Sequence, residues 1–411
     1  MDSTVAPERR RAQLWVLTAT HAANDFYTGA VAALLPFFVL HAHYSYAAVA
    51  GITLAATALS SIAQPGFGYL SDRYGLGWIS LAGLLAAGAG VALSGFFSSS
   101  YIVVWVLIAM SGIGVAAYHP AATMQAREAG GGTTAAMSLF SVGGNAGVAL
   151  APAAAVAVVG AFGLRGTGLL IVPAVVLALA YFVVARHQLF RRVKPRDVAV
   201  AAHTDLRDDW RAFGWLTAVL ATWSVAYVGT STFVVLYCVA RFHSTPDYAS
   251  IALTVFPAAG AVGTLAGGWL SDRVGRLPVL RCGYLAGVGG IVAIVLAPSP
   301  LVVFVATGAL GLALFAPFAG QITLAHSYLP NRIGVASGVT LGLTLSLGGV
   351  VSPLLGMIAD GVGVRWVFVI LAALLAVGFG TSFVLAERAP AQIEVVDVPG
   401  DAEVAPATSV T

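Results

Sequence analysis

One phrase occurs twice in this sequence, 200 residues apart, and it divides the chain into two equivalent halves. Residues 68–75 read Gly-Tyr-Leu-Ser-Asp-Arg-Tyr-Gly, and residues 268–275 read Gly-Trp-Leu-Ser-Asp-Arg-Val-Gly. Gly163 is matched in the same way by Gly363. Long apolar runs flank both copies of the phrase. The two halves are therefore predicted to share one structural plan.

The apolar runs are too abundant for a soluble protein of this length. The chain is 59% hydrophobic and 9% charged, whereas soluble domains have about 45–50% apolar and roughly 25% charged residues. Runs of about 20 apolar residues recur along the chain, and each is long enough to cross a bilayer as a helix. The alternating pattern of membrane barrel strands is absent from the sequence. We therefore predict an all-α polytopic membrane protein.

The apolar runs divide into six, a polar linker, and six more. Two six-helix bundles of this kind, over residues 13–185 and 212–386, would give twelve transmembrane helices around a pseudo-twofold axis. The linker is predicted at 186–211, between a cytoplasmic tail at 1–12 and a disordered cytoplasmic tail at 387–411. The spans are predicted near 13–40, 46–70, 78–98, 101–121, 134–160, 166–185, 212–240, 249–270, 278–297, 301–325, 334–358 and 363–386.

The distribution of positive charge predicts the orientation. An even number of spans puts both termini on one side, and all Lys and Arg residues fall on that side except Arg165, Arg241 and Arg365. Basic loops stay in the cytoplasm, so both termini are predicted to be cytoplasmic, in the cell inner (plasma) membrane. The charged linker is predicted to be a solvated connector, with a regulatory or lipid-binding patch as the alternative.

The repeated phrase Gly-x-Leu-Ser-Asp-Arg-x-Gly lies between the second and third predicted spans, and again between the eighth and ninth. In that position it resembles the signature loop of the major facilitator superfamily, a family of membrane transporters. The resemblance extends over nearly the whole chain and implies the major facilitator fold, with a central cavity that opens alternately to each side of the membrane.

The first half carries more specific motifs. They are His21-x-x-Asn24-Asp25-x-Tyr27, Gln64-Pro65-x-x-Gly68, His119-Pro120 and Phe140-x-x-Gly143-Gly144-Asn145-x-Gly147. Together they resemble the fosmidomycin-resistance-type efflux proteins within the same superfamily. This resemblance implies proton-coupled efflux of small molecules and leaves the substrate of this chain open.

Asp25 is the one acidic residue predicted to lie deep inside a span. At ~1.5 Å per residue from residue 13, it lies about 18 Å into a hydrocarbon core of roughly 30 Å. An ionised Asp at a helix centre costs about 2.5–3.5 kcal/mol, so this group is predicted to bind and release a proton during transport. His21 lies one turn earlier on the same face, and the pair is predicted to titrate together. A hydrogen-bonded clasp between helices is the structural alternative.

Other polar and aromatic residues are candidates for the cavity, because the first, fourth, seventh and tenth spans line it in facilitators. Trp223 and Tyr227 are one helical turn apart and could form an aromatic wall. Packing between helices is the alternative for the aromatic residues. The predicted substrate-binding residues are Asn24, Tyr27, His119, Asn145, Trp223, Tyr227, Phe315, Phe318 and Gln321.

The two copies of the repeated loop are predicted to form a conformational latch. The family resemblance implies that such loops hold the two halves together at the cytoplasmic side when the cavity opens outward, and a carboxylate there can accept hydrogen bonds from a helix N-terminus. The alternative is that the arginines only enforce orientation. The latch residues are Gly68, Asp72, Arg73, Gly75, Gly268, Asp272, Arg273 and Gly275.

These observations predict a secondary active transporter that exports a small drug-like molecule or metabolite in exchange for protons. An importer of a small nutrient on the same fold and a non-transporting membrane sensor are the alternatives. The sequence shows no nucleophile–base signature and no phosphate-binding loop, so an enzyme is not expected, and the proton gradient replaces a cofactor. No metal site is predicted, because His21 and Asp25 lack a nearby third ligand. The expected partners are the substrate and the lipid bilayer, with no nucleic acid and no obligate protein partner.

Overall fold

The computed structural model describes residues 7–74, 76–130, 134–189 and 207–388, and within these ranges the regular structure is entirely helical. A helix satisfies every backbone N–H and C=O group within one segment, which is why apolar runs fold as helices in lipid. Ten of the described helices are long and apolar enough to cross a membrane, and Trp78–Ser94 and Ser346–Val362 are shorter apolar helical segments. This arrangement agrees with the predicted twelve-span fold.

The helices of the first half follow the predicted spans closely and extend beyond several of them. The predicted sixth span begins earlier than a regular α-helix does, because a 3-10 helix at Leu164–Leu170 leads into it. The α-helices are α1 (Pro7–Ala42), α2 (Tyr46–Tyr74), α3 (Trp78–Ser94), α4 (Tyr101–Ala129), α5 (Thr134–Phe162) and α6 (Ile171–Leu189).

The second half repeats this order, with one interruption. Span ten, predicted as one helix over 301–325, is broken at Pro317 into α10 and α11. Proline has no N–H to donate and its ring clashes with the preceding turn, which explains this correction. The helices are α7 (Trp210–Phe242), α8 (Pro246–Val274), α9 (Arg276–Leu296), α10 (Pro300–Phe315), α11 (Phe318–Tyr328), α12 (Ile333–Val362) and α13 (Val364–Thr381).

The internal repeat extends to backbone geometry. His43 follows α1 with a φ of 57°, and His243 follows α7 with a φ of 54°. Positive φ is uncommon for residues other than glycine, so its recurrence 200 residues apart confirms that both halves use the same connection. The prediction of one plan for two halves therefore holds at the level of individual turns.

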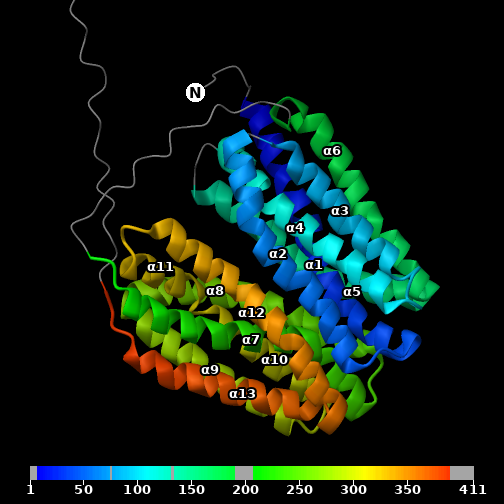
Figure 1. Ribbon diagram of the computed structural model, residues 1–411, viewed down its shortest axis with the longest axis vertical. Coiled ribbons are helices and arrows are strands. Elements are labelled where there is room, and N and C mark those ends of the chain that lie inside the picture. The colour runs from blue at the N-terminus through cyan, green and yellow to red at the C-terminus, as the bar shows by residue number, and fades with distance from the viewer. Residues whose placement is uncertain (1–6, 75, 131–133, 190–206, 389–411) are drawn as a thin grey trace, which may run out of the picture.

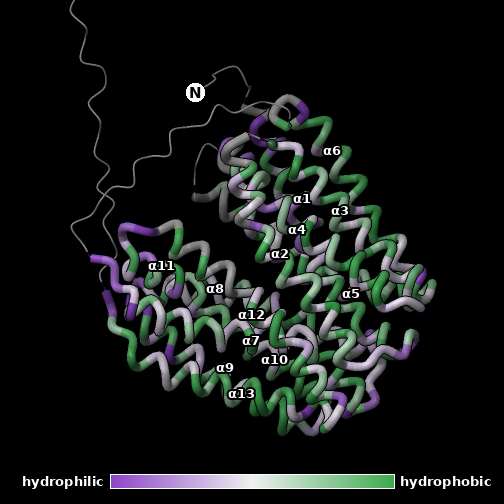
Figure 2. The backbone as a smooth tube through the Cα atoms, viewed as in Figure 1, coloured by the Kyte–Doolittle hydropathy of each residue, from purple (hydrophilic) through white to green (hydrophobic). Residues whose placement is uncertain are grey.

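The two halves form separate bundles joined along one boundary (Figure 1). We call the end where α1 begins, α6 ends and α7 begins the linker end. The halves lie closer together at the end opposite the linker than at the linker end (Figure 1). The most extensive contacts between the halves are those of α2 with α12 and of α5 with α8. Figure 2 shows hydrophobic residues along most of the outer helices, as a lipid-facing surface requires.

Helices α1 and α5 pack closely in the interior of the first half. A Cβ at Gly143 would clash with the backbone oxygen of Thr18, and one at Gly147 would clash with that of Ala22. Two small residues four apart let helix backbones approach where lipid supplies no hydrophobic drive for association. This approach brings the α5 backbone to the polar residues of α1.

Candidate functional site

The polar centre of the first half is a cluster of three side chains. Oδ2 of Asp25 lies 3.3 Å from Nε2 of His21, and Oδ1 of Asp25 lies 3.1 Å from Nε2 of His119. His21 and Asp25 share one face of α1 because they are four residues apart. His119 comes from α4. The pair predicted from the sequence is therefore part of a triad, and His119, predicted only as a substrate-binding residue, contacts the carboxylate of Asp25.

The second nitrogen of each imidazole is held by a backbone carbonyl. Nδ1 of His21 lies 2.7 Å from the carbonyl oxygen of Phe140, and Nδ1 of His119 lies 2.8 Å from that of Val115. A carbonyl oxygen only accepts hydrogen bonds, so both Nδ1 atoms carry hydrogen. In the neutral tautomer each Nε2 is then an acceptor that faces a carboxylate.

The hydrogen-bonding pattern sets how many protons the triad needs. Each of the two Nε2–oxygen contacts needs one proton, placed either on the imidazole or on the carboxyl group of Asp25. Two protons satisfy both contacts and leave the triad with a net charge of one positive unit. Loss of one proton neutralises the triad and leaves two acceptors facing each other. Two protons therefore satisfy both contacts, and one proton satisfies only one of them.

Neighbouring residues fix the triad in place. Asn24 donates from Nδ2 to Oδ1 of Asp25 over 3.2 Å, and its own buried Oδ1 has no hydrogen-bond partner among the described residues. The ring of Phe140 stacks on that of His21 with centroids 4.1 Å apart. A Cβ at Gly144 would lie 2.5 Å from Oδ2 of Asp25. Sequence reasoning quoted Gly144 in a motif but missed this role.

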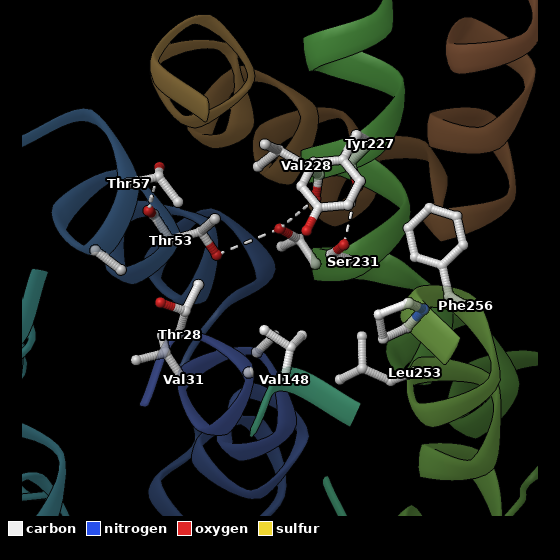
Figure 3. A pocket seen from close by; sticks show the side chains of 15 residues that line it. Thr28, Val31, Thr53, Thr57, Val148, Tyr227, Val228, Ser231, Leu253 and Phe256 are labelled. Atoms are coloured by element: carbon white, nitrogen blue, oxygen red, sulfur yellow. Dashed lines mark hydrogen bonds between the residues drawn. The ribbon is translucent and has the colours of Figure 1, made fainter. Parts of the chain in front are cut away.

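A pocket lies between the two halves (Figure 3). Thr28, Thr53 and Val148 line it from the first half, and Tyr227 and Phe256 line it from the second. Its volume of about 60 Å³ has room for a few water molecules, whereas pockets for drug-sized ligands measure ~300–1,000 Å³. A substrate would need the halves to separate further than they do around this pocket.

Hydroxyl groups form the polar lining of this pocket, and sequence reasoning missed them. Thr57 donates to the backbone oxygen of Thr53 over 2.7 Å, and Ser231 donates to that of Tyr227 over 3.0 Å (Figure 3). Thr232 donates to the backbone oxygen of Val228 and lies 3.3 Å from the hydroxyl of Thr53. The spacing of Thr53 and Thr57 on one face of a predicted span was the available signal.

The predicted aromatic residues of the second half do come together. Ring centroids lie 5.2 Å apart for Trp223 and Tyr227, 5.5 Å for Tyr227 and Phe315, and 5.7 Å for Trp223 and Phe318. Phe256, which sequence reasoning missed, lies 5.7 Å from Tyr227. Tyr227 lines the pocket between the halves.

Trp223 supports this cluster from inside the second half. Its side chain is 1% exposed, and Nε1 donates to the backbone oxygen of Leu314 over 2.6 Å. An indole that is buried and already hydrogen-bonded packs against Tyr227 rather than offering a free donor to a ligand. The packing interpretation therefore fits Trp223 better than the predicted substrate contact.

Three other predicted binding residues are not among those that line this pocket. Tyr27 is fully buried, donates to the backbone oxygen of Leu170 and accepts from the N–H of Ala174, so its hydroxyl is engaged within the first half. Gln321 is buried inside the second half and donates to the hydroxyl of Tyr284 over 3.1 Å. Asn145 is exposed on α5, one residue beyond Gly144.

The residues of the predicted latch that belong to the second half lie within the described part of the chain. Asp272 and Arg273 are exposed, the guanidinium of Arg273 lies 3.8 Å from the ring centroid of Trp269, and Gly275 ends α8 with a φ of +94°. Arg276, just beyond the repeat, is the buried cation, with Nε 2.6 Å from Oε1 of Glu387.

In the first half, the side chains of Asp72 and Arg73 and the whole of Gly75 lie outside the described residues. A Cβ at Gly68 would lie 4.0 Å from that of Pro120, and one at Gly268 would have no neighbour within that distance. The latch therefore stays a prediction.

The triad also changes the argument about metals. His119 supplies the third nitrogen or oxygen atom that the sequence seemed to lack, and the three candidate ligand atoms lie within 4.8 Å of one another. The sequence-based reason for excluding a metal is therefore wrong. A proton can bridge each of the two Nε2–oxygen contacts, and we interpret the triad through its protons.

Comparison with known proteins agrees with the fold. A match to the Major Facilitator Superfamily covers residues 15–353 and 240–402. The fosmidomycin resistance protein of Escherichia coli (strain K12) is 28% identical over 377 residues, which are 90% of this chain and 92% of that protein. The uncharacterized MFS-type transporter YfnC of Bacillus subtilis (strain 168) is 25% identical over 372 residues, 89% of this chain and 90% of the relative.

Solved structures show the same fold. A bacterial homologue of the human lysosomal transporter Spinster, in an inward-facing and occupied conformation, superposes with a TM-score of 0.75 at 16% identity, covering 92% of this chain and 97% of that one. The nucleoside transporter NupG gives 0.74 at 11% identity, covering 91% and 99%. Together with the family match, these findings show that the chain belongs to the Major Facilitator Superfamily and is a multi-pass membrane transporter rather than an enzyme.

Proposed function

We propose that this transporter exports a small drug-like molecule or metabolite in exchange for protons, with the linker end and both termini facing the cytoplasm. The orientation rests on the basic residues, which the sequence predicts to lie on the face of the termini except for Arg165, Arg241 and Arg365. In bacteria such a chain would lie in the inner membrane.

The triad of His21, Asp25 and His119 is the observation that carries this proposal. Its two hydrogen-bonded contacts to Asp25 require two protons, and removing one leaves an unfavourable contact between two acceptors. In a site of low polarity such a contact is costly. Release of a proton therefore favours either a rearrangement of the helices that carry the triad or the arrival of a donor group from a ligand.

The position of the triad couples this event to substrate binding. The side chains of Asp25 and His119 are 20% and 26% exposed, so both are accessible. Asp25 lies about one helical turn before Thr28, which lines the pocket from the first half. A change of one charge unit at the triad would therefore alter the affinity for a polar ligand in the pocket, and the ligand would alter proton affinity by the same factor.

The similarity to the fosmidomycin resistance protein supports export rather than import. Resistance by a transporter requires removal of the toxic compound from the cell. We therefore take fosmidomycin as the first test compound for this chain, without assigning it as the substrate.

The test uses inside-out membrane vesicles with an acidic lumen. Addition of labelled fosmidomycin, or of the compound against which expression gives the strongest growth protection, should discharge the pH gradient and accumulate in the lumen. With the Asp25→Asn variant, the compound should neither discharge the pH gradient nor accumulate in the lumen. Asp247→Asn, which changes an exposed acid in the first turn of α8, should behave like the unaltered protein.

Two outcomes would contradict the proposal. Full exchange by Asp25→Asn would remove the triad from proton coupling. Loss of a preloaded compound from the lumen together with protons, without accumulation of external compound, would indicate an importer on the same fold.

A further inference from the structure

Asp360 joins the two halves at the end opposite the linker. It lies near the end of α12, and its two carboxylate oxygens accept hydrogen bonds from the backbone N–H groups of Tyr46 over 2.8 Å and of Ala47 over 2.9 Å. Tyr46 and Ala47 are the first two residues of α2. The first N–H groups of a helix have no partner within that helix, so a residue of the other half satisfies them here.

The electrostatics of this contact are favourable in two ways. The N-terminus of a helix carries a partial positive charge that stabilises a carboxylate, and hydrogen bonds to an ionised acceptor are stronger than neutral ones. The next N–H group, that of Ala48, is capped within its own half by the hydroxyl of Ser45 over 3.1 Å. Asp360, on α12 of the second half, therefore completes the N-terminal cap of α2 in the first half.

The face of α12 toward α2 is shaped to allow this contact. A Cβ at Gly356 would lie 2.6 Å from the backbone oxygen of Tyr46 and 2.7 Å from Cα of Ala47, and a Cβ at Gly349 would clash with the hydroxyl of Thr57. Gly349, Gly356 and Asp360 are spaced by seven and four residues, so they share one face of the helix. The two glycines bring the backbones together and place the carboxylate over the start of α2.

The internal repeat shows that this contact is built only once. Where α2 begins with Tyr46, α8 begins with Pro246, and proline has no N–H to donate. Residues 158–161, which correspond to the surroundings of Asp360 in the first half, read Val-Val-Gly-Ala and contain no acid. The preceding turns are alike, because His43 and His243 share the same backbone geometry. The counterpart seam thus lacks the acceptor and one of the two donors.

We propose that Asp360 is a clamp that holds the transporter closed at the end opposite the linker, and that opening at this end requires the carboxylate to leave the N-terminus of α2. This inference rests on the alternating-access part of the proposed function, and it is independent of the substrate and of proton coupling. It assigns to Asp360 a role in the balance between the two open states, not in binding.

The test measures the separation of the two halves at this end. Ser99 and Ser299, which lie 200 residues apart beside the α3–α4 and α9–α10 connections, would be changed to cysteine and spin-labelled. The native Cys238 and Cys282 would be replaced by alanine and serine. Distances between the labels would be recorded by pulsed electron paramagnetic resonance for the full chain in lipid nanodiscs.

Asp360→Ala should raise the ratio of open to closed distances by about tenfold, which corresponds to ~1.4 kcal/mol. Asp247→Ala is the matched control, because this acid lies at the same end in the first turn of α8 and is exposed. It should leave the distance distribution unchanged. Identical distributions for Asp360→Ala and the unaltered protein would overturn the clamp.

A second variant separates the clamp from an effect on folding. Tyr46→Pro removes one of the two donors and copies the residue that starts α8, at a helix position that proline tolerates well. It should open the same end by a smaller factor. The double variant Tyr46→Pro with Asp360→Ala should open it no further than Asp360→Ala alone, because both changes break one interaction. Fully additive effects would contradict the clamp.

The outcomes are distinguishable from those of the exchange test. A shift in distances with Asp360→Ala together with full exchange by Asp25→Asn would support the clamp and reject the assignment of proton coupling. No shift with Asp360→Ala together with a loss of exchange in Asp25→Asn would do the reverse.

Discussion

His119 of α4 places Nε2 3.1 Å from Oδ1 of Asp25 on α1, while the other oxygen of the same carboxylate faces His21. One carboxyl group is thus shared by two imidazoles whose second nitrogens are both held by backbone carbonyls. The shared contact converts a pair on one helix into a unit that links α1, α4 and α5. Its protonation can therefore act on the packing of these helices.

His119→Gln should make transport less steeply dependent on pH. The glutamine amide can donate a hydrogen bond to Asp25 but cannot gain or lose a proton near neutral pH, so one titrating group leaves the coupled unit. The measurement is the initial rate of exchange in vesicles between pH 5.5 and 8.5, at matched membrane abundance. A profile with the same steepness and midpoint as the unaltered protein would place His119 outside the coupled unit.

Gly144→Ala should impair exchange by displacing the triad. The new methyl group would lie 2.5 Å from Oδ2 of Asp25 and 2.8 Å from Cε1 of His21, which is closer than van der Waals contact allows. Gly160→Ala on the same helix is the control, since a Cβ there meets no atom within 4 Å. The expected result is a shifted pH profile for Gly144→Ala at normal abundance, with Gly160→Ala unchanged; equal profiles for both would contradict the close approach.

Tyr227 and Trp223 should differ when each is changed to alanine. Tyr227→Ala removes an aromatic face that lines the pocket, and the lost contact should weaken substrate binding by about 0.5–1.5 kcal/mol beyond the loss of buried area. Trp223→Ala leaves a cavity beneath it and should mainly lower thermal stability. Binding titrations and thermal unfolding of the purified variants measure both effects. Equal losses of affinity with unchanged stability would assign both residues to the binding surface.

Asp72→Asn tests the predicted latch of the repeated loop. If the carboxylate stabilises closure at the linker end through a helix N-terminus, the variant should insert normally, transport slowly and spend more time open at that end. Spin labels on the linker ends of α2 and α8 would report the change. The alternative, in which the loop only enforces orientation, leaves the distances unaltered because Arg73 remains in place.

Much of this architecture could be predicted from local pattern and repetition. The length of the apolar runs predicts the helices, because a lipid-exposed backbone must satisfy its own hydrogen bonds. The repeat at Gly68–Gly75 and Gly268–Gly275 predicts two equivalent bundles. The pairing of His21 with Asp25 follows from helix geometry alone, since four residues complete about one turn.

The contacts between helices could be identified only from the tertiary structure. His119 is 94 residues from Asp25 in the sequence, and no local pattern shows that α4 turns it toward α1. Tyr27 shares a helix with Asp25 yet faces α6, because the rotation of a helix is decided by its neighbours. Asp360 is 314 residues from Tyr46, and only the packing of α12 on α2 shows that it caps that helix. The sequence alone determined which segments cross the membrane, and the packing of those segments decided which side chains meet.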